Sequence, residues 1–251
     1  MRCFLTMSHQ SNIYSYRQFK DSHKGETCVI IGNGPSLRDV DDAFLYKYPT
    51  FGTNLIVMRE NFAPTYYSGI GYNHFDTLER AEAVWGILDH PNLKAAFINR
   101  LVIHMYRHPK VWSILAGNTY GEPNWEKTDD DNIRIRFGTD PLNNVGVFAT
   151  TIYVQIQLAA YMGFTTALLV GLDHYYDVDD SKGQHFYEEG TQEAYDPPDY
   201  PWDITEEYSS KADIAYRVSL VVGEQIGLEF INLTPGSLCD VFDMGNIDDW
   251  R

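Results

Sequence analysis

A short glycine loop carries the residues of this chain that are best suited to bind a charged ligand. In order along the chain they are Gly32, Asn33, Gly34, Pro35 and Ser36. Glycine removes side chains where a ligand must approach the main chain, Ser36 can cap the helix that follows, and Pro35 suits its first position. Because a helix N-terminus attracts anions, the loop is a candidate phosphate site. Its spacing matches neither a dinucleotide-binding loop nor a P-loop, so a tight structural turn remains the alternative.

Acidic residues follow a second apolar run, Ala167 to Val170, and offer further chemistry. Asp173 and His174 come shortly after this run, where they either brace a strand end or take part in catalysis. Three more carboxylates lie further along, at Asp177, Asp179 and Asp180. These are the best candidates for magnesium ligands, with a solvated turn as the alternative.

The composition is that of an acidic, globular protein. With 251 residues, 44% of them hydrophobic, the chain can bury a large core as one domain or as one domain with an inserted lid. Its formal net charge of -16 repels polyanions, which argues against nonspecific binding to nucleic acid or to anionic lipid surfaces. Any phosphate site must therefore be local.

Cysteine content and hydropathy indicate a reducing compartment. Only Cys3, Cys28 and Cys239 are present, without the paired spacing of a zinc site or a disulfide framework. Residues 1–10 lack the apolar run of a signal peptide, and no stretch of roughly 20 apolar residues could span a membrane. We therefore expect a cytoplasmic protein without a transmembrane segment.

Apolar runs alternate with helical patterns, which predicts an α/β domain with a Rossmann-like, mainly parallel sheet flanked by helices. The expected strands are Cys28 to Gly32, Thr50 to Asn54, Thr65 to Ile70, Ala95 to Ile98, Ala167 to Val170 and Leu228 to Asn232. The expected helices are Phe75 to Leu88, Pro109 to Leu115, Val147 to Met162, and one from Ile204 or Ser209 to about Ile226. Gly163 and Gly227 should end the last two helices.

A long polar segment, at about 174–205, interrupts this pattern and is rich in proline, aromatic and acidic residues. Loops of this length in compact domains are commonly lids or binding segments. We therefore expect one domain at 27–242 with a lid-like insertion, an N-terminal extension at 1–26 and a C-terminal tail at 243–251.

Several segments match a known family in order and spacing. They are Val29 to Leu37, Phe51 to Asn54, Pro64 to Tyr67, Gly163 to Tyr175, Gln184 to Phe186 and Asn232 to Ser237. Over about residues 27–242 the chain resembles the bacterial 6-hydroxymethylpterin diphosphokinase-like (MptE-like) family. Members of that family often belong to surface-polysaccharide functions and share a fold with inverting bacterial sialyltransferases. The resemblance implies a transferase of surface-glycan or lipopolysaccharide biosynthesis.

On its sialyltransferase side, the resemblance implies a site for a cytidine-monophosphate-activated sugar. The residues implied in nucleotide and donor binding are Gly32, Asn33, Gly34, Pro35, Ser36, Asn54, Asn73, Asn144, Asp173 and His174. Asn54 would lie at the carboxyl edge of the sheet, where open α/β folds place ligands. Asn144 corresponds to a loop that carries hydroxyl side chains in those enzymes, and here it offers an amide. Asn73 lies close to the position where related transferases often have an asparagine.

The same resemblance implies a direct displacement with inversion that needs no metal. Tyr175 matches a tyrosine that hydrogen-bonds the leaving phosphate and stabilises its charge, and Tyr176 serves if the register shifts by one. A general base takes the proton of the acceptor hydroxyl. His185 lies where the family places such a residue, and histidine titrates near working pH. Strict alignment puts the base nearer Glu189, and Glu188 or Glu189 could substitute if burial raised its pKa.

Two other functions remain open. A diphosphokinase would use ATP with Mg²⁺, which carboxylates anchor. The expected strand ends at Thr53–Asn54 and Gly69–Gly71 offer no paired carboxylate, which favours glycosyl transfer without a cofactor. The third function is a non-catalytic nucleotide-binding protein of the same fold. In the favoured interpretation the partners are a nucleotide-sugar donor and a glycan acceptor, not nucleic acid, and a homo-oligomer is compatible with it.

Overall fold

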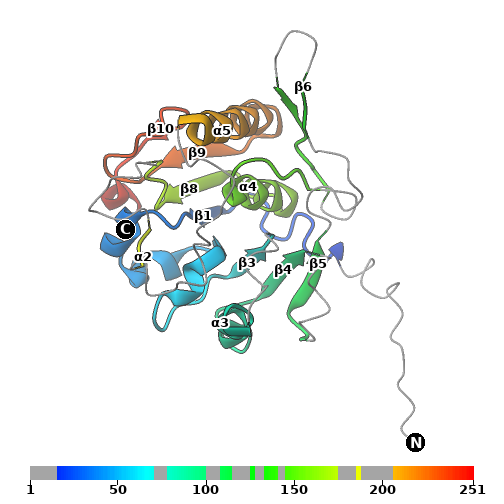
Figure 1. Cartoon of the computed structure of the whole chain (residues 1–251), viewed down its shortest axis with the longest axis vertical. Coiled ribbons are helices and arrows are strands. Elements are labelled where there is room, and N and C mark those ends of the chain that lie inside the picture. Colours follow the sequence, from blue (N-terminus) through cyan, green and yellow to red (C-terminus); the bar gives the residue numbers. More distant parts are fainter. Residues whose placement is uncertain are drawn as a thin grey trace, which may run out of the picture.

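The computed structural model describes residues 16–70, 78–99, 108–114, 125–127, 133–140, 145–174, 185–187 and 206–251. Its centre is an eight-stranded sheet in the order β10-β9-β8-β1-β2-β3-β4-β5, with every neighbouring pair parallel (Figure 1). Helices cover both faces of this sheet. The predicted α/β, Rossmann-like fold class is confirmed.

The elements have the following bounds. The strands of the sheet are β1 (Thr27–Ile31), β2 (Thr50–Thr53), β3 (Tyr66–Gly69), β4 (Ala95–Asn99), β5 (Val111–Ile114), β8 (Thr166–Val170), β9 (Glu229–Asn232) and β10 (Asp243–Met244). A separate antiparallel pair consists of β6 (Trp125–Lys127) and β7 (Ile133–Ile135). The α-helices are α2 (Asp42–Lys47), α3 (Leu78–Leu88), α4 (Thr151–Met162) and α5 (Glu206–Ile226). Short 3-10 helices are η1 (Pro35–Asp39), η2 (Asn54–Met58) and η5 (Ile247–Trp250).

The six predicted strands are confirmed to within one residue at each end, but the predicted helix from Pro109 to Leu115 is wrong. Residues 109–110 form a turn and Val111–Ile114 form β5, which pairs in parallel with β4 through Ala96 and Val111. The run is too short for periodicity to separate a helix from a strand. Its β-branched and aromatic residues suit a pleated surface, and pairing with β4 decides the outcome.

The two predicted long helices are confirmed as α4 and α5, but α4 begins four residues later than predicted. α4 begins at Thr151 rather than Val147, because Ala149 has a positive φ of 53° that no helix accommodates. Thr150 is its N-cap, and Gly163 ends it in the left-handed region at φ 82°. Gly227 follows α5 in the same way, at φ 77°. The first residues of the predicted helix at 75–88 lie outside the described residues.

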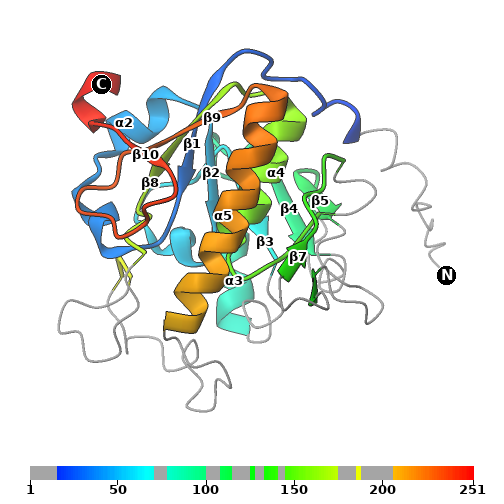
Figure 2. The ribbon, with the colours of Figure 1, turned by 90° about the horizontal axis from the view of Figure 1, so that it is seen from above.

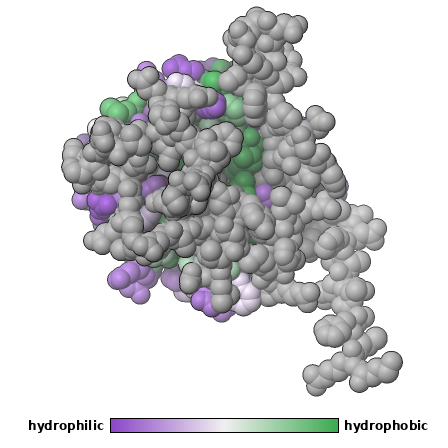
Figure 3. Space-filling model, viewed as in Figure 1, coloured by the Kyte–Doolittle hydropathy of each residue, from purple (hydrophilic) through white to green (hydrophobic). Residues whose placement is uncertain are grey.

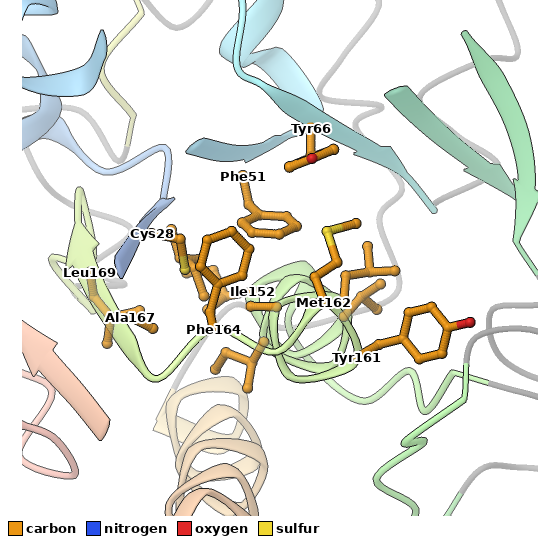
Figure 4. Close-up of a cluster of buried hydrophobic side chains, with 14 of the residues drawn as sticks. Cys28, Phe51, Tyr66, Ile152, Tyr161, Met162, Phe164, Ala167 and Leu169 are labelled. Carbon is orange, nitrogen blue, oxygen red and sulfur yellow. The ribbon is translucent and has the colours of Figure 1, made fainter. Parts of the chain in front are cut away.

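Two layers of helix enclose the sheet. α4 and α5 contact each other and pack on one face, together with the segment at 16–25 (Figure 2). Figure 4 shows Phe51, Met162 and Phe164 gathered between this face of the sheet and α4. η1, α2, η2 and α3 pack on the opposite face. Hydrophobic residues are visible near the middle of the view in Figure 3, and hydrophilic residues lie along its rim.

Both ends of the described chain contact this core. In the segment at 16–25, which belongs to the predicted extension, Tyr16, Phe19 and His23 are buried. In the predicted tail, β10 adds an edge strand to β9, and the Trp250 carbonyl accepts a hydrogen bond from Tyr48 Oη at 2.9 Å. No helix within the described residues is both long enough and apolar enough to cross a bilayer.

The order of the strands reverses between β1 and β8. From β1 the chain adds β2 to β5 on one side, and later it adds β8 to β10 on the other. Open α/β sheets bind ligands at such a switch point, beyond the carboxyl ends of the strands. α4 contributes its N-terminus to that edge, since its C-terminal carbonyls, of Tyr161 and Met162, bind the chain that leads into β1.

Candidate functional site

Two glycine-containing loops meet where β1 and β8 end. The Gly32 amide donates to the Val170 carbonyl at 2.8 Å, and the Gly34 amide donates to the Gly171 carbonyl at 2.9 Å. A Cβ on Gly32 would lie 2.3 Å from the Gly171 oxygen, and Gly171 itself has a φ of 67°. Glycine is therefore required here so that the two backbones can touch. This contact builds the switch point of the sheet.

Asp173 binds the start of η1. Its carboxylate accepts the Ser36 amide at 3.1 Å and the Ser36 hydroxyl at 2.7 Å. Pro35 lies in the first turn as predicted, but the N-cap is Gly34 rather than Ser36, because Ser36 lies inside η1 and turns to Asp173. The Asp173 carboxylate thus binds the Ser36 amide, in the loop where we expected the phosphate of a ligand to bind. Gly34 and Ser36 use their amides to hold the two loops together.

Two asparagines line the carboxyl ends of β1 and β2. Asn33 Nδ2 donates to the Thr53 carbonyl at 3.2 Å, whereas the buried Asn33 Oδ1 has no hydrogen-bond partner among the described residues. Asn54 is half-buried with a φ of 51°, a conformation that asparagine tolerates better than most residues. Its Oδ1 accepts from Thr53 Oγ1 at 3.1 Å, and its carbonyl accepts from Tyr67 Oη at 3.2 Å. Asn33 and Asn54, the two predicted donor-binding asparagines that the structure describes, thus share one edge.

His174 connects the end of β8 to α5. Its Nε2 lies 2.9 Å from Asp213 Oδ1, its side chain is almost completely buried, and its ring packs near Tyr216. Asp173 and His174 are adjacent in sequence but bind different neighbours, η1 and α5. Both contacts match the bracing alternative that the sequence left open.

His185 lies beside the glycine loop. The next residue, Phe186, donates its amide to the Asn33 carbonyl at 2.9 Å, and its side chain packs against the core under η1. The His185 ring stacks on Tyr187 with a centroid distance of 4.7 Å. The structure therefore brings the predicted base next to the predicted nucleotide loop. The other predicted site residues, Asn73, Asn144, Tyr175 and Glu189, lie outside the described residues, as do Tyr176, Asp177, Asp179, Asp180 and Glu188.

Gln157, on α4, was missed by the sequence reasoning. Its Oε1 accepts the amides of Gly138 at 2.6 Å and Gly146 at 2.8 Å, and its Nε2 donates to the Gly146 carbonyl at 2.8 Å. The side chain is buried and so fixes residues 145–146, which directly follow the predicted donor-binding Asn144. The available signal was a glutamine inside an apolar helix.

Arg59 was also missed, and it joins the segments that follow β1 and β2. Its guanidinium donates to the Leu37 carbonyl and to Asp42 Oδ1, both at 2.8 Å, and to the Val40 carbonyl. Arg59 caps the end of η2, which begins at Asn54. It therefore fixes the Asn54 segment relative to η1 and the glycine loop.

A separate polar cluster occupies the opposite, amino edge of the sheet. His23 binds Glu26 through Nδ1 at 2.8 Å and the Tyr66 hydroxyl through Nε2 at 2.7 Å, beside a cavity of about 380 Å³. Burial, with a smaller contribution from the charge of Glu26, raises the pKa of Tyr66 to about 12. Burial also raises the pKa of the Cys28 and Cys239 thiols. Across the described ranges, no three His, Cys, Asp or Glu residues are grouped to hold a metal ion.

The fold is similar to that of the sialyltransferase CstII from Campylobacter jejuni, solved in complex with a substrate analogue, cytidine-5′-monophosphate. The two structures align over 89% of this chain and 86% of that one, with a TM-score of 0.50 and 10% sequence identity. The fold is sialyltransferase-like. At this identity the similarity shows the fold alone. No family model and no curated protein matches the chain, so the diphosphokinase-like family stays a prediction.

Proposed function

We propose that this protein is a glycosyltransferase whose donor is a CMP-activated sugar, bound at the carboxyl edge between β1, β2 and β8. The observation that carries the proposal is the buried Asn33 Oδ1, which has no partner among the described residues. A buried acceptor without a partner is costly, and a ligand N–H or O–H would satisfy it. A nucleotide offers such donors on its ribose and base.

The surrounding geometry supports the same proposal. Asn33 lies at the switch point, where open sheets bind ligands, and Asn54 lies at the next strand end. The N-terminus of α4 faces this edge, and its dipole favours negative charge there in a chain whose net charge is -16. The sialyltransferase-like fold, in a neighbour solved with cytidine-5′-monophosphate, is compatible with this nucleotide.

The proposed reaction is a single displacement with inversion at the sugar. The acceptor hydroxyl oxygen attacks the anomeric carbon, the bond from that carbon to the phosphate oxygen breaks, and CMP leaves with the bonding electrons. His185 takes the acceptor proton, and its place beside Asn33 supports this role. Tyr175 donates to the departing phosphate, and no metal is required. We place the reaction in surface-glycan biosynthesis.

Nucleotide binding tests this proposal. Calorimetric titration and thermal unfolding are followed with CMP, CDP, ATP and GTP, each with and without Mg²⁺. CMP should bind without Mg²⁺ and, at 100 times its dissociation constant, should stabilise the protein by about 2.7 kcal/mol. Asn54→Ala should weaken CMP binding at least about tenfold, since it removes an amide at the site. Asn92→Ala is the matched control, because Asn92 binds the Ala63 carbonyl at the opposite edge.

The other outcomes contradict the proposal in distinct ways. Binding of ATP only with Mg²⁺ would transfer the assignment to diphosphate transfer. Binding of no nucleotide would remove both enzymatic functions. CMP binding that is equally strong in Asn54→Ala and the unchanged protein would place the nucleotide elsewhere.

A further inference from the structure

Residues 185–187 lie directly against the start of η1. The Phe186 amide donates to the Asn33 carbonyl at 2.9 Å, and the partly buried Phe186 side chain packs against the core cluster that includes Leu37 and Val170. This backbone contact and this packing place His185 at the glycine loop. They do not by themselves fix its orientation, because the hydrogen bond belongs to the next residue.

Arg38 supplies a further constraint on the backbone of His185. Its Nε donates to the Phe186 carbonyl at 2.8 Å and its Nη2 donates to the His185 carbonyl at 2.7 Å. One planar guanidinium thus holds two consecutive carbonyls, which fixes the peptide plane between them. The rigid fork of arginine suits this two-point contact, whereas a lysine ammonium would act as a single point charge.

The short helix η1, which carries Arg38, is itself held at both ends. Asp173 binds Ser36 at the start of this short helix, and Arg59 binds the Leu37 and Val40 carbonyls at its end. The backbone of Arg38 is therefore fixed, so that its two guanidinium donors hold the His185 and Phe186 carbonyls in place relative to η1.

We propose that Arg38 is a positioning residue, which sets the imidazole of His185 over the glycine loop for proton transfer. This inference rests on the function proposed above. Arg38 itself touches no reacting atom in this mechanism and acts through the backbone of His185. A general base must lie within hydrogen-bond reach of the proton that it takes, so loss of the two carbonyl contacts should slow the chemical step.

The effect should be specific to turnover. Arg38 is exposed, and its hydrogen bonds lie at the surface, so Arg38→Met should fold normally and keep its unfolding temperature. It should also keep its affinity for CMP, since Arg38 contacts neither asparagine. Its kcat for transfer from CMP-sialic acid, used as the probe donor, should fall about 10- to 100-fold while KM for that donor stays unchanged. Arg38→Lys should recover only part of this loss.

A second measurement does not depend on turnover. The imidazole signals of His185 in histidine-labelled protein are identified by NMR from their loss in His185→Gln. Because the ring stacks on Tyr187, these signals should be shifted away from those of a free histidine. Arg38→Met should move them towards the free values. Arg217→Met is the matched control, since Arg217 is an exposed arginine paired with Asp240 at 3.5 Å, and it should leave them in place.

The two measurements separate the two proposals. If the His185 signals move in Arg38→Met while no CMP-sugar is turned over by any variant, the positioning contact stands and the proposed function fails. If the His185 signals are the same in Arg38→Met and the unchanged protein, the inference is overturned. It is also overturned if kcat is unaffected by Arg38→Met in an active enzyme.

Discussion

Replacement of Gln157 by methionine should destabilise the protein far more than the same replacement at Gln155. Both glutamines lie in α4, both are buried, and methionine matches glutamine in length and helix propensity. They differ in their partners. Gln157 binds the backbone of Gly138 and Gly146, whereas both amide atoms of Gln155 lack a hydrogen-bond partner among the described residues.

The structure gives the expected magnitudes. Gln157→Met removes four hydrogen bonds to the backbone, with the amides of Gly138 and Gly146 and the carbonyls of Gly146 and Tyr153, at a net cost of about 1 kcal/mol each. The free energy of unfolding should therefore fall by about 4 kcal/mol, which corresponds to roughly 12 °C in unfolding temperature for a chain of this size. Gln155→Met removes a buried amide that has no hydrogen-bond partner among the described residues, so stability should stay the same or rise by about 1 kcal/mol.

Urea unfolding followed by circular dichroism measures both values, with equal slopes required so that the midpoints can be compared. A loss of about 2 kcal/mol or more in Gln155→Met would show that its amide is bonded in the folded protein. A loss below about 1 kcal/mol in Gln157→Met would show that the glycine contacts contribute little. Either result would refute the reasoning from hydrogen-bond partners.

Two more predictions concern the glycine loop and the amino-edge cluster. Gly34→Ala should lower the free energy of unfolding, measured in urea, by about 2 kcal/mol, since the new Cβ would lie 2.0 Å from Asp173 Oδ2. Gly86→Ala is the control: Gly86 lies inside α3 with open space around it, so this change should raise the free energy of unfolding by about 0.5 kcal/mol. Equal effects of the two changes would contradict the reasoning. Tyr66 has its pKa raised from 10.0 to about 12, so the unfolded phenol ionises first as the pH rises. The difference between these two pKa values corresponds to about 3 kcal/mol of stability, which is complete below pH 10 and should be lost as the pH rises from about 10 through 12. Across this pH range, the free energy of unfolding should decline less steeply in Tyr66→Phe than in the unchanged protein. An equally steep decline in both would refute the role of Tyr66.

Local patterns were sufficient to predict most of the sheet. β1 and β8 are continuous apolar runs followed by glycine, and such runs are typical of strands buried on both faces. The C-terminal ends of α4 and α5 were predictable because Gly163 and Gly227 supply the left-handed conformation that ends a helix. β5 was not, because a run of four residues carries no decisive period, and only its pairing with β4 makes it a strand.

The candidate site was predictable in its location but not in its contacts. Gly32 and Asn54 are the last residues of two predicted strands, so their shared edge could be deduced from parallel topology alone. The contact of Ser36 with Asp173 joins residues 137 positions apart, and that of Arg38 with His185 joins residues 147 positions apart. No local spacing encodes such contacts, which depend on how the two halves of the sheet come together.

The position of β1 in the sheet also has a consequence for synthesis of the chain. β1 is made early, but its neighbour β8 is made only after β2 to β5 have left the ribosome. Until then the backbone N–H and C=O groups on one side of β1 are unpaired and can form hydrogen bonds with a strand of another chain. Parallel pairing of distant strands is slow, because a long loop must close before any contact forms. The nascent protein is therefore exposed to aggregation at this stage, and any chain that stops before Thr166 lacks β8, which forms one side of the proposed ligand-binding edge.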